Sequence, residues 1–486
     1  MKKLARGKGM DNYNYDTVVI GGGAAGLSVA TASAKLGLRT ALIEREKLGG
    51  DCLYYGCIPS KTIINSAKVA SLIRRAREFG LNEIPLSFDF SKVIEHVWSV
   101  IHKVGEHDSP DRFREMGVDV IFGQPAFLSR EELEVNGKII RSKRFVISTG
   151  SRSLTPPIPG LKETGFLSHI DVFHLKTLPE SLVVIGAGPI GMELSQVFSR
   201  LGSRVTVVEM MERILPMEDE DISKTLEKLL SDEGIEFLTG TQAKHVFSET
   251  GKKVIVAEKN GKEIILKTDE ILVATGRTPN VEGLNLEAAG VQYNRKGIVV
   301  NKRLQTTSKN IWACGDVVGP FLFTHMAEYQ AGIVVRNAIL RIPTKVDYSV
   351  VPWTIFTDPE VAHVGITEME AREKGIKYEV YKHHFNKVDR ALTEVEDKGF
   401  IKIITTGWRG NIIGAHIIGP HAGELIGEVA LAIKKGLTVN DISSTVHVYP
   451  TLSLGIRQTT DLFFRRKFES SWVINRVLRF VVKLLN

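Results

Sequence analysis

Three things that the sequence has little of narrow the class of protein before any motif is considered. It has only three cysteines in 486 residues, too few for a secreted scaffold held together by disulfides. It has no uninterrupted apolar run of about 18 residues, so we expect no membrane-spanning helix. No apolar stretch or small-residue cleavage site follows the basic N-terminus MKKLARGKGM, so we expect no secretory signal. These absences favour a cytoplasmic protein.

The composition is that of a globular protein, with 43% hydrophobic and 24% charged residues and no low-complexity segment. A chain of this length suggests about three domains. The net charge of +7 could favour anionic cofactors or a membrane surface, although surface lysines scattered over the chain explain it more simply. We expect no nucleic-acid partner.

Two glycine-rich segments each follow a short Val/Ile-rich stretch and precede an expected helix. The first has an expected strand at 17–20, glycines within 21–26, a helix to Leu36 and a strand at 39–43 that leads into Glu44. The second has an expected strand at 182–185, glycines within 186–191, a helix to Leu201 and a strand at 205–208 that leads into Glu209. In both, the glutamate stands 18 positions after the last glycine of the segment.

This pattern is the fingerprint of a dinucleotide-binding βαβ unit, present twice. Its first glycine makes the tight turn, its second lets the backbone approach a pyrophosphate, and its third lets the helix pack on the strand. The N-terminus of the helix adds partial positive charge for the phosphates. The glycines are Gly21, Gly23 and Gly26 in the first segment and Gly186, Gly188 and Gly191 in the second. The alternative is two ordinary turns of a doubly wound sheet.

The segment 49–61, GGDCLYYGCIPSK, has four residues between Cys52 and Cys57. Two cysteines at this spacing at the start of a helix can close a small redox-active disulfide, and the helix N-terminus lowers the pKa of a nearby thiol. Two unrelated buried thiols are the alternative for such spacing alone. The flanking GG and PSK, next to a dinucleotide fingerprint, favour the redox pair.

With these motifs the chain resembles the class I pyridine nucleotide-disulfide oxidoreductases, the family of dihydrolipoamide dehydrogenase, glutathione reductase and mercuric reductase. The resemblance covers roughly residues 15 to 460. Further motifs agree in order: VISTG at 146–150, VATGR at 273–277, IWACGD at 311–316 and FTDPEVAHVG at 356–365. A Pro-rich hinge at 155–160 and alternating strands and helices after Val346, with strands at 378–383, 400–405 and 412–418, fit the family's domain order.

The resemblance implies an α/β fold with two Rossmann-like dinucleotide-binding domains plus a C-terminal α+β dimerisation domain, assembled as a homodimer. The expected boundaries are 15–155 and 279–346 for the two parts of the FAD-binding domain, 156–278 for the NAD(P)-binding domain, 347–460 for the dimerisation domain and 461–486 for a tail.

The resemblance also implies roles for single residues. Cys57 would face the flavin and form a charge-transfer thiolate, and Cys52 would exchange with substrate. Lys61 and Glu193 would pair near the flavin N5. The residues implied for FAD binding are Gly21, Gly23, Gly26, Glu44, Gly150 and Asp316, and those for NAD(P) binding are Gly186, Gly188, Gly191, Glu209 and Gly276. Cys314 would be a small buried bystander, and no metal-ligand set is expected.

Glu209 favours NADH as the electron donor. A carboxylate at the end of the second strand can accept hydrogen bonds from a ribose 2′-hydroxyl, whereas it would repel a 2′-phosphate. Arg213, four residues later, could instead support phosphate binding, or it could form a surface ion pair.

The chain departs from the family near its C-terminal end. Dihydrolipoamide dehydrogenase and glutathione reductase have a catalytic His-Pro-Thr followed by an orienting Glu, whereas this chain has Tyr449 and Leu454 at those two positions. A tyrosine has a reference pKa near 10, against about 6.5 for histidine, so it is a poor base at neutral pH. His447, two residues earlier, is the alternative acid/base.

Mercuric reductase resembles the chain in having Tyr in place of the catalytic His, at position 449 of this sequence. The alternative role of Tyr449 is packing at a subunit interface. The chain lacks the C-terminal vicinal cysteines and the N-terminal CxxC domain typical of mercuric reductases, which argues against detoxification of Hg(II). The leading acceptor is therefore a thiol-avid metal ion or a small disulfide-like electrophile. Dihydrolipoamide dehydrogenase is the second hypothesis, and a membrane-attached flavin redox relay or sensor is the third.

The tail at 461–486 has a basic amphipathic pattern. Its polar stripe consists of Asn475, Arg479, Lys483 and Asn486, and its apolar residues include Trp472, Val473, Ile474, Val477, Leu478, Phe480, Val481 and Leu484, preceded by Arg465, Arg466 and Lys467. This pattern fits a helix in the plane of a membrane surface, on the inner face of a membrane. Packing on the partner subunit is an equal alternative.

Overall fold

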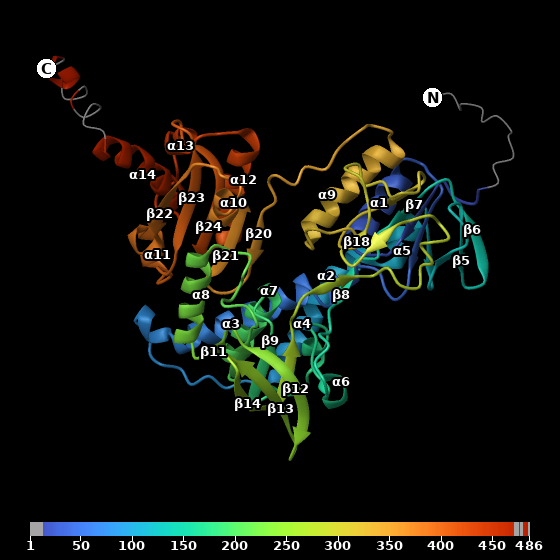
Figure 1. The fold of residues 1–486 in the computed structure, drawn as a ribbon, viewed down its shortest axis with the longest axis horizontal. Coiled ribbons are helices and arrows are strands. Elements are labelled where there is room, and N and C mark those ends of the chain that lie inside the picture. Colours follow the sequence, from blue (N-terminus) through green and yellow to red (C-terminus); the bar gives the residue numbers. More distant parts are fainter. Residues whose placement is uncertain (1–12, 471–475, 477–479, 485–486) are drawn as a thin grey trace. The chain divides into compact units, whose positions relative to one another are not determined.

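The computed structural model describes residues 13–470, 476 and 480–484. The chain divides into two compact units (Figure 1). The first contains Met1–Thr62, Ile94–Thr155 and Gly276–Asp347, and the second contains Ile63–Val93, Pro156–Thr275 and Tyr348–Asn486. The domains expected at 156–278 and 347–460 thus fall largely within the second unit, and their separate boundaries stay a prediction.

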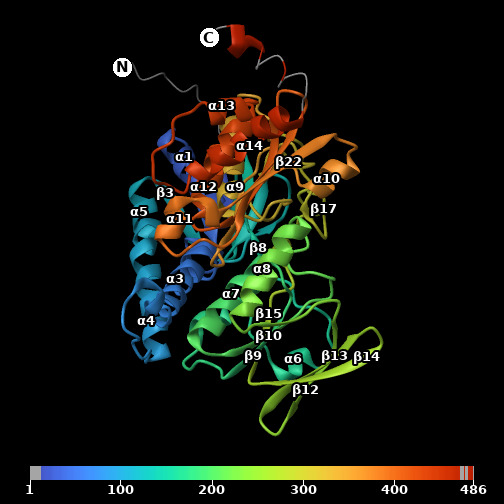
Figure 2. The same ribbon diagram turned by 90° about the vertical axis from the view of Figure 1, so that its left-hand side faces the viewer.

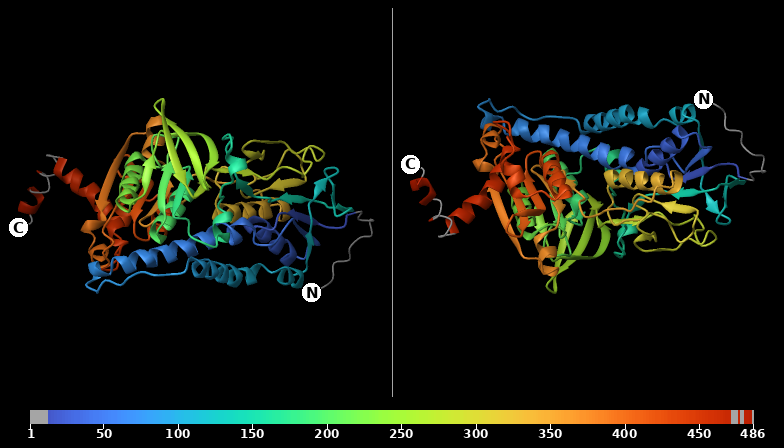
Figure 3. Two further views of the ribbon diagram at one scale, coloured as in Figure 1. Left: turned by 90° about the horizontal axis from the view of Figure 1, so that it is seen from below. Right: turned by 90° about the horizontal axis from the view of Figure 1, so that it is seen from above.

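The centre of the first unit is a parallel sheet with the strand order β19-β7-β1-β2-β3. Its strands are β1 (Thr17–Ile20), β2 (Thr40–Glu44), β3 (Val118–Phe122), β7 (Phe145–Ile147) and β19 (Ile311–Ala313). Val18 and Ile20 enter one apolar cluster and Val19 enters another, because successive side chains of a strand point to opposite faces. The sheet is therefore covered on both sides, as parallel sheets usually are. On one side α1 (Ala24–Lys35) packs against α9 (Thr324–Val334), as Figure 3 shows.

The other elements of the first unit are short. They are α2 (Gly50–Tyr54), α5 (Pro110–Glu115), β4 (Ala126–Phe127), β5 (Glu132–Val135), β6 (Lys138–Arg141), β8 (Ser151–Ser153), β16 (Arg277–Pro279), β17 (Tyr293–Asn294) and β18 (Gly297–Ile298). The boundary between the units falls within α3 (Cys57–Arg74) and within α4 (Phe90–Gly105).

The second unit begins with a parallel sheet in the order β11-β10-β9-β15. Its strands are β9 (Ser181–Ile185), β10 (Arg204–Val208), β11 (Glu236–Leu238) and β15 (Glu270–Val273). The helix α7 (Pro189–Leu201) packs on β9 and β10 (Figure 2). The helix α8 (Glu220–Asp232) packs on β11. An antiparallel sheet of β12 (Gln242–Glu249), β13 (Lys252–Lys259) and β14 (Lys262–Thr268) follows, and α6 (Leu161–Thr164) contacts β12.

The third sheet of this unit is antiparallel and has five strands, in the order β20-β21-β24-β23-β22. Its strands are β20 (Trp353–Ile355), β21 (Glu360–Gly365), β22 (Tyr378–His384), β23 (Phe400–Thr406) and β24 (Asn411–Gly419), and its helices are α10 (Glu368–Glu373), α11 (Asp389–Thr393), α12 (Ala422–Lys435), α13 (Val439–Ser443) and α14 (Leu454–Ser470). The helices α12 and α14 contact these strands, and one face of the sheet forms the largest part of an apolar core.

The expected strands and helices around the two glycine segments agree with the structure to within one residue at most ends. The strand expected at 17–20 is β1, and the first helix ends at Lys35, just before Gly37 with its φ of 76°. The second helix ends at Leu201, before Gly202 with a φ of 118°. The α/β class is confirmed, because a buried strand, a glycine turn and an amphipathic helix are each specified locally.

The expected tail overlaps α14, whose residues pack on β22 and β23 of the five-stranded antiparallel sheet. Phe463 is buried and contacts Tyr381 edge to face, and the Arg466 guanidinium lies over the same Tyr381 ring. Most of the expected amphipathic stripe lies outside the described residues. Among the residues that the structure describes, no helix is long and apolar enough to cross a membrane.

Candidate active site and cofactor sites

The two cysteines of the expected redox pair lie on consecutive helices, the one-turn helix α2 and the 18-residue helix α3. Cys52 is in α2 and Cys57 is the first residue of α3, so a break at Tyr55 and Gly56 replaces the single helix start that the sequence suggested. The Gly56 N–H donates to the Asp51 carbonyl at 2.6 Å. A Cβ on Gly56 would lie 3.1 Å from the Cys52 Cα. A residue without a side chain therefore lets the two thiols approach.

The electrostatics distinguish the two thiols. A hydrogen bond with the Cys57 side chain, and then burial, raise the pKa of the Cys52 thiol above its ordinary value. Cys57 Sγ lies 3.4 Å from Thr324 Oγ1 and stands at the N-terminus of α3, where the helix dipole stabilises negative charge. A single thiolate is therefore better placed on Cys57, while the proton stays on Cys52.

The first glycine loop forms a tight backbone cradle beside Glu44. Glu44 accepts hydrogen bonds from the Gly22 N–H at 2.6 Å and from the Glu46 N–H at 2.8 Å. A Cβ on Gly26 would lie 1.9 Å from the Gly21 carbonyl oxygen, so α1 can approach β1 this closely only with glycine there. Gly23 is the N-cap of α1, and a Cβ there would meet only the Gly50 Cα, at 3.8 Å. The loop thus leaves room for a pyrophosphate at the helix N-terminus.

The second glycine loop repeats this geometry in the second unit. Glu209 accepts from the Ala187 N–H at 2.7 Å and from the Met211 N–H at 2.8 Å. A Cβ on Gly191 would lie 2.1 Å from the Gly186 carbonyl oxygen, and a Cβ on Gly188 would meet nothing within 4 Å. This is the arrangement that a second dinucleotide needs.

Among the residues that the structure describes, Arg213 has no ion-pair partner within 4 Å, unlike the surface ion pair that is one expectation for it. Its Nη2 donates to the carbonyl oxygens of Pro216 and Glu218, at 3.0 and 3.2 Å. Its guanidinium is thus directed along its own loop toward Glu218, which makes it a weaker candidate for binding a 2′-phosphate beside Glu209.

Asp316 belongs to a polar network that no sequence motif predicts. Ser151 Oγ donates to Asp316 at 2.6 Å, and Arg277 Nε donates to Ser151 Oγ at 2.8 Å. Arg277 Nη2 also donates to the Asp51 carboxylate at 3.0 Å. Burial raises the pKa of Asp316, and the Ser151 hydrogen bond and the Arg277 charge oppose that shift. Arg277 therefore links the Asp316 region to the residue that precedes Cys52.

The remaining expected site residues lie as follows. Gly150 has a φ of 68° and its carbonyl accepts from the Asn280 N–H, whereas Gly276 has a φ of 122° and begins the last segment of the first unit. Lys61 lies in α3 within the first unit. Glu193 lies in α7 of the second unit, where it is buried and accepts from the Phe356 N–H at 2.8 Å. The pairing of Lys61 with Glu193 stays a prediction.

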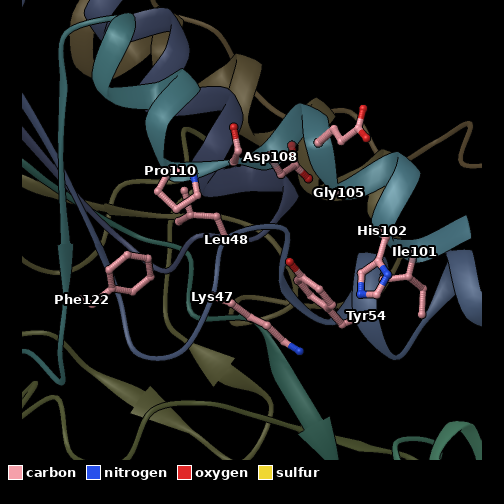
Figure 4. A pocket seen from close by; sticks show the side chains of 11 residues that line it. Lys47, Leu48, Tyr54, Ile101, His102, Gly105, Asp108, Pro110 and Phe122 are labelled. Atoms are coloured by element: carbon pink, nitrogen blue, oxygen red, sulfur yellow. The ribbon is translucent and has the colours of Figure 1, made fainter. Parts of the chain in front are cut away.

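A cavity of about 330 Å³ lies next to the first glycine loop, within the first unit (Figure 4). Lys47 and Leu48, which follow Glu44, line it together with Phe122, Tyr54 and His102. Phe122 pairs directly with Glu44 across β3 and β2, and the Lys47 ammonium lies 3.8 Å from the centre of the Tyr54 ring. The acidic residues Glu106 and Asp108 also line it, so the cavity combines aromatic walls with charges of both signs.

Tyr449 is largely exposed and its phenol donates to Asp389 Oδ2 at 3.0 Å. This hydrogen bond raises the pKa of Tyr449 above its ordinary value, which makes it a still poorer base. The His447 side chain is only 6% exposed and its Nε2 lies 3.0 Å from Glu428 Oε1. The two side chains thus differ in exposure, and Glu428 holds the His447 ring. Leu454 begins α14.

Two regions of the chain match known sequence families. Residues 15–331 match the pyridine nucleotide-disulphide oxidoreductase family, and residues 351–459 match the dimerisation domain of that family. The two matches together cover both expected dinucleotide sites, the cysteine pair and the segment that contains Tyr449.

Individual proteins agree with this assignment. A mercuric reductase of Bacillus cereus is 36% identical over 447 residues, covering 92% of this chain and 71% of that protein. A dihydrolipoyl dehydrogenase of Bacillus subtilis is 36% identical over 459 residues, covering 91% and 96%. The Cu(II) complex of a mutant of the HOCl-induced flavoprotein disulfide reductase RclA from Escherichia coli has a TM-score of 0.85 at 30% identity, covering 93% and 99%.

The matched families confirm the fold expected from the motifs, including the C-terminal dimerisation domain. They also confirm FAD and NAD(P)H as the cofactors, since the family is FAD-dependent and uses NAD(P)H. The chain belongs to the pyridine nucleotide-disulphide oxidoreductases.

Proposed function

We propose that this enzyme uses NADH to reduce a soft, thiol-avid metal ion or a small disulfide-like electrophile through Cys52 and Cys57. Bound FAD supplies a carrier for the two electrons that NADH delivers. The chain would hold FAD with Gly21, Gly23, Gly26, Glu44, Gly150 and Asp316, and it would hold the nicotinamide dinucleotide with Gly186, Gly188, Gly191, Glu209 and Gly276.

The observation that carries the choice of acceptor is the state of Tyr449. Its phenol donates to Asp389, and its pKa is raised by that bond. A dithiol or disulfide substrate needs a proton moved to or from a sulfur at each exchange, and general acid–base help is worth about a hundredfold to ten-thousandfold. Tyr449 cannot accept that proton near neutral pH, so organic disulfides should be poor substrates.

A metal ion makes different demands on the protein. It binds the two thiolates directly, and the thiol protons leave to water, so no protein base has to return them. Cys57 would hold the thiolate next to the flavin, and Cys52, whose pKa is raised, would lose its proton when the metal ion takes its place. We propose that Lys61 and Glu193 pair to orient the hydride donor, and that the Tyr449 phenol lies beside the bound acceptor.

The dimerisation-domain match supports a homodimer. Val446, Val448 and Tyr449 are 92%, 73% and 66% exposed in the segment before α14. Such a run of exposed apolar residues is typical of a surface that a partner covers. We propose that the second subunit covers it and so brings Tyr449 to the site of its partner.

Two kinds of relative support different acceptors. RclA was solved as a Cu(II) complex, which favours a metal ion, whereas dihydrolipoyl dehydrogenases match at the same 36% identity as mercuric reductase. Dihydrolipoamide oxidation is therefore the second candidate, and Tyr449 with Leu454 is the observation against it.

The test is reoxidation of the NADH-reduced enzyme, followed by stopped-flow absorbance, with Hg(II), Cu(II), lipoamide and glutathione disulfide. We expect the metal ions to be fast and the disulfides slow. Tyr449→Phe should slow the metal reaction more than the residual disulfide reaction. The double variant Tyr449→His/Leu454→Glu should raise lipoamide turnover. Rapid lipoamide turnover by the unmodified enzyme would make it a dihydrolipoamide dehydrogenase instead.

We further propose that the C-terminal tail contacts a membrane surface, as in the third candidate, a membrane-attached redox relay. Phe480, Val481 and Leu484 are exposed around the exposed Lys483, which is the mixture that an interfacial helix presents. Deleting residues 471–486 should release the enzyme from anionic vesicles in a sedimentation assay without loss of flavin. Equal sedimentation of both forms would contradict this.

A further inference from the structure

A row of polar and aromatic side chains crosses the five-stranded antiparallel sheet of the second unit. Directly paired positions on adjacent strands give the row Trp353, His363, His416, Lys402 and Lys382. Their strand neighbours Ala362, Ala415 and Ile417 belong to the apolar core on one face of the sheet. Because side chains alternate along a strand, the row lies on the opposite face.

The acidic segment at the start of α8 covers this row. At one end Lys402 is fully buried, and its ammonium lies 2.7 Å from Asp219, 2.9 Å from Asp221 and 2.6 Å from Glu368. Lys382 pairs with Asp221 as well. At this end of the row, the two lysine ammonium groups therefore occupy the space between the carboxylates and offset part of their charge.

The other end of the row surrounds Glu218, whose side chain is only 3% exposed. Its Oε1 accepts from Trp353 Nε1 at 2.7 Å. Its Oε2 lies 3.0 Å from His416 Nε2 and 3.7 Å from His363 Nδ1. Within the described part of the chain, neither lysine nor arginine forms an ion pair with Glu218. A buried carboxylate is costly unless a cation or several hydrogen bonds stabilise it.

The hydrogen bonds of His363 determine which nitrogen faces Glu218 without a proton. His363 Nε2 lies 3.0 Å from the Gly365 carbonyl oxygen, which only accepts, so Nε2 carries the hydrogen. A neutral ring then leaves a lone pair on Nδ1. This atom is buried, has no hydrogen-bond partner among the described residues and faces the Glu218 oxygen.

His416 is in a similar position between two carboxylates. Its Nδ1 lies 3.3 Å from Asp219 Oδ2, although off the axis of a hydrogen bond, and its Nε2 faces Glu218. A neutral ring can carry a hydrogen toward only one of them. With the hydrogen on Nδ1, toward Asp219, the Nε2 lone pair joins that of His363 Nδ1 at the Glu218 oxygen.

We propose that Glu218 Oε2, His363 Nδ1 and His416 Nε2 form a binding site for a divalent transition-metal ion, with Zn²⁺ the ion that this donor set suits best. The three ligand atoms lie within 4.8 Å of one another. Tetrahedral zinc with bonds of 2.0–2.1 Å places its ligands about 3.4 Å apart, close to the 3.0 and 3.7 Å separations from Glu218. Two imidazoles and one glutamate are a known zinc donor set.

The groups outside the three ligands fit this proposal. Metal-bound histidines usually donate their second ring N–H to a carboxylate or a backbone carbonyl, and Asp219 and Gly365 stand in those places. The Lys402 ammonium lies 2.7 Å from Asp219 Oδ2 and thus holds this carboxylate in place. The ion would join the segment before α8 to β21 and β24, so its role is structural and separate from Cys52 and Cys57.

The test is zinc binding to the full chain in a Cys52→Ser/Cys57→Ser background, because the redox thiols would bind zinc themselves. After dialysis against a chelator, ZnCl₂ is added, excess is removed by gel filtration, and bound zinc is measured by mass spectrometry. We expect about one zinc per chain in this geometry. Co²⁺ in its place should give the visible absorption of a tetrahedral site.

The variants separate this site from other histidines. Glu218→Gln, which keeps the side-chain volume, and His363→Ala should lose the zinc and the cobalt absorption. Asp219→Asn should weaken zinc affinity about 10- to 100-fold as a positioning effect. The matched control His384→Ala alters an exposed histidine that packs edge to face on Phe400, and it should bind zinc normally. No stoichiometric zinc in the parent, or unchanged binding in Glu218→Gln, would overturn the proposal in favour of a metal-free hydrogen-bond network.

Discussion

The two glycine loops have almost the same internal geometry but different surroundings. In each, the glutamate at the end of the second strand accepts from the backbone of the loop's second residue and from the residue two positions after itself. In each, the third glycine lies against the carbonyl oxygen of the first. The fingerprint therefore fixes how a loop holds an acidic side chain and a phosphate, but not what encloses the ligand.

The surroundings differ at the second glycine. Gly23 faces Gly50, two residues before Cys52, and Leu48 packs where a Cβ of Gly22 would come within 2.6 Å. Gly188 has no such neighbour within 4 Å. The first loop is thus enclosed by the segment that carries the dithiol, as suits a cofactor that stays bound, whereas the second is open, as suits a dinucleotide that exchanges at each turnover.

The largest effect is expected from replacing the third glycine of each loop in turn with alanine. In Gly26→Ala and Gly191→Ala the new methyl group would meet a carbonyl oxygen at 1.9 and 2.1 Å, an overpacking that costs about 1–3 kcal/mol. Gly26→Ala should be purified with little or no flavin. Gly191→Ala should keep its flavin absorbance and lose most of its reduction by NADH.

Each of these variants is the control for the other, provided that far-ultraviolet circular dichroism shows both to be folded. Loss of flavin from folded Gly191→Ala would show that the two loops do not act separately. Retention of full flavin by Gly26→Ala would show that the first loop does not hold FAD as proposed.

A smaller effect is expected from removing the glutamates. Glu209→Ala loses a charge-assisted hydrogen bond worth about 1.5–3 kcal/mol, so kcat/KM for NADH should fall roughly ten- to hundredfold, with a smaller change for NADPH. Glu44→Ala should weaken FAD retention and leave the ratio of NADH to NADPH unchanged. Steady-state kinetics with both nucleotides measures this. A clear preference of the unmodified enzyme for NADPH would contradict the proposed role of Glu209.

The smallest effect is expected at Arg213. Its guanidinium donates to the carbonyl oxygens of Pro216 and Glu218, so Arg213→Ala should change NADH and NADPH kinetics by similar, small factors. A selective loss of NADPH turnover would show that Arg213 turns toward a 2′-phosphate. The second loop would then accept NADPH in spite of Glu209.

The parts of the molecule that could be predicted from sequence are those with local signals. The strands before each glycine loop, the helices after them and the glutamates at fixed distance follow from short-range pattern. The position of Tyr449 follows from aligned motifs, but its partner Asp389 stands 60 residues earlier in the chain. No periodicity connects such a pair.

The polar row of the antiparallel sheet shows the same limit more clearly. Each strand contributes one residue, such as His363 within EVAHVG or Lys402 within FIKIITT, and each looks like an isolated exception in an apolar strand. Only the register of four strand pairs and a glutamate about 150 positions from His363 bring them together. Strand register is not encoded in hydrophobic alternation alone. The sequence signal for this row is a lysine or histidine within an otherwise apolar strand, because such a side chain needs a buried polar partner.

The most direct test of the proposed electron path is the absorbance spectrum of the purified enzyme on reduction by two electrons under anaerobic conditions. With the proton on Cys52 and the thiolate on Cys57, a long-wavelength charge-transfer band to the flavin should appear. Cys57→Ser should abolish the band, and Cys52→Ser should show it before any reductant is added. Spectra unchanged in both variants would contradict a Cys52–Cys57 pair that exchanges electrons with FAD.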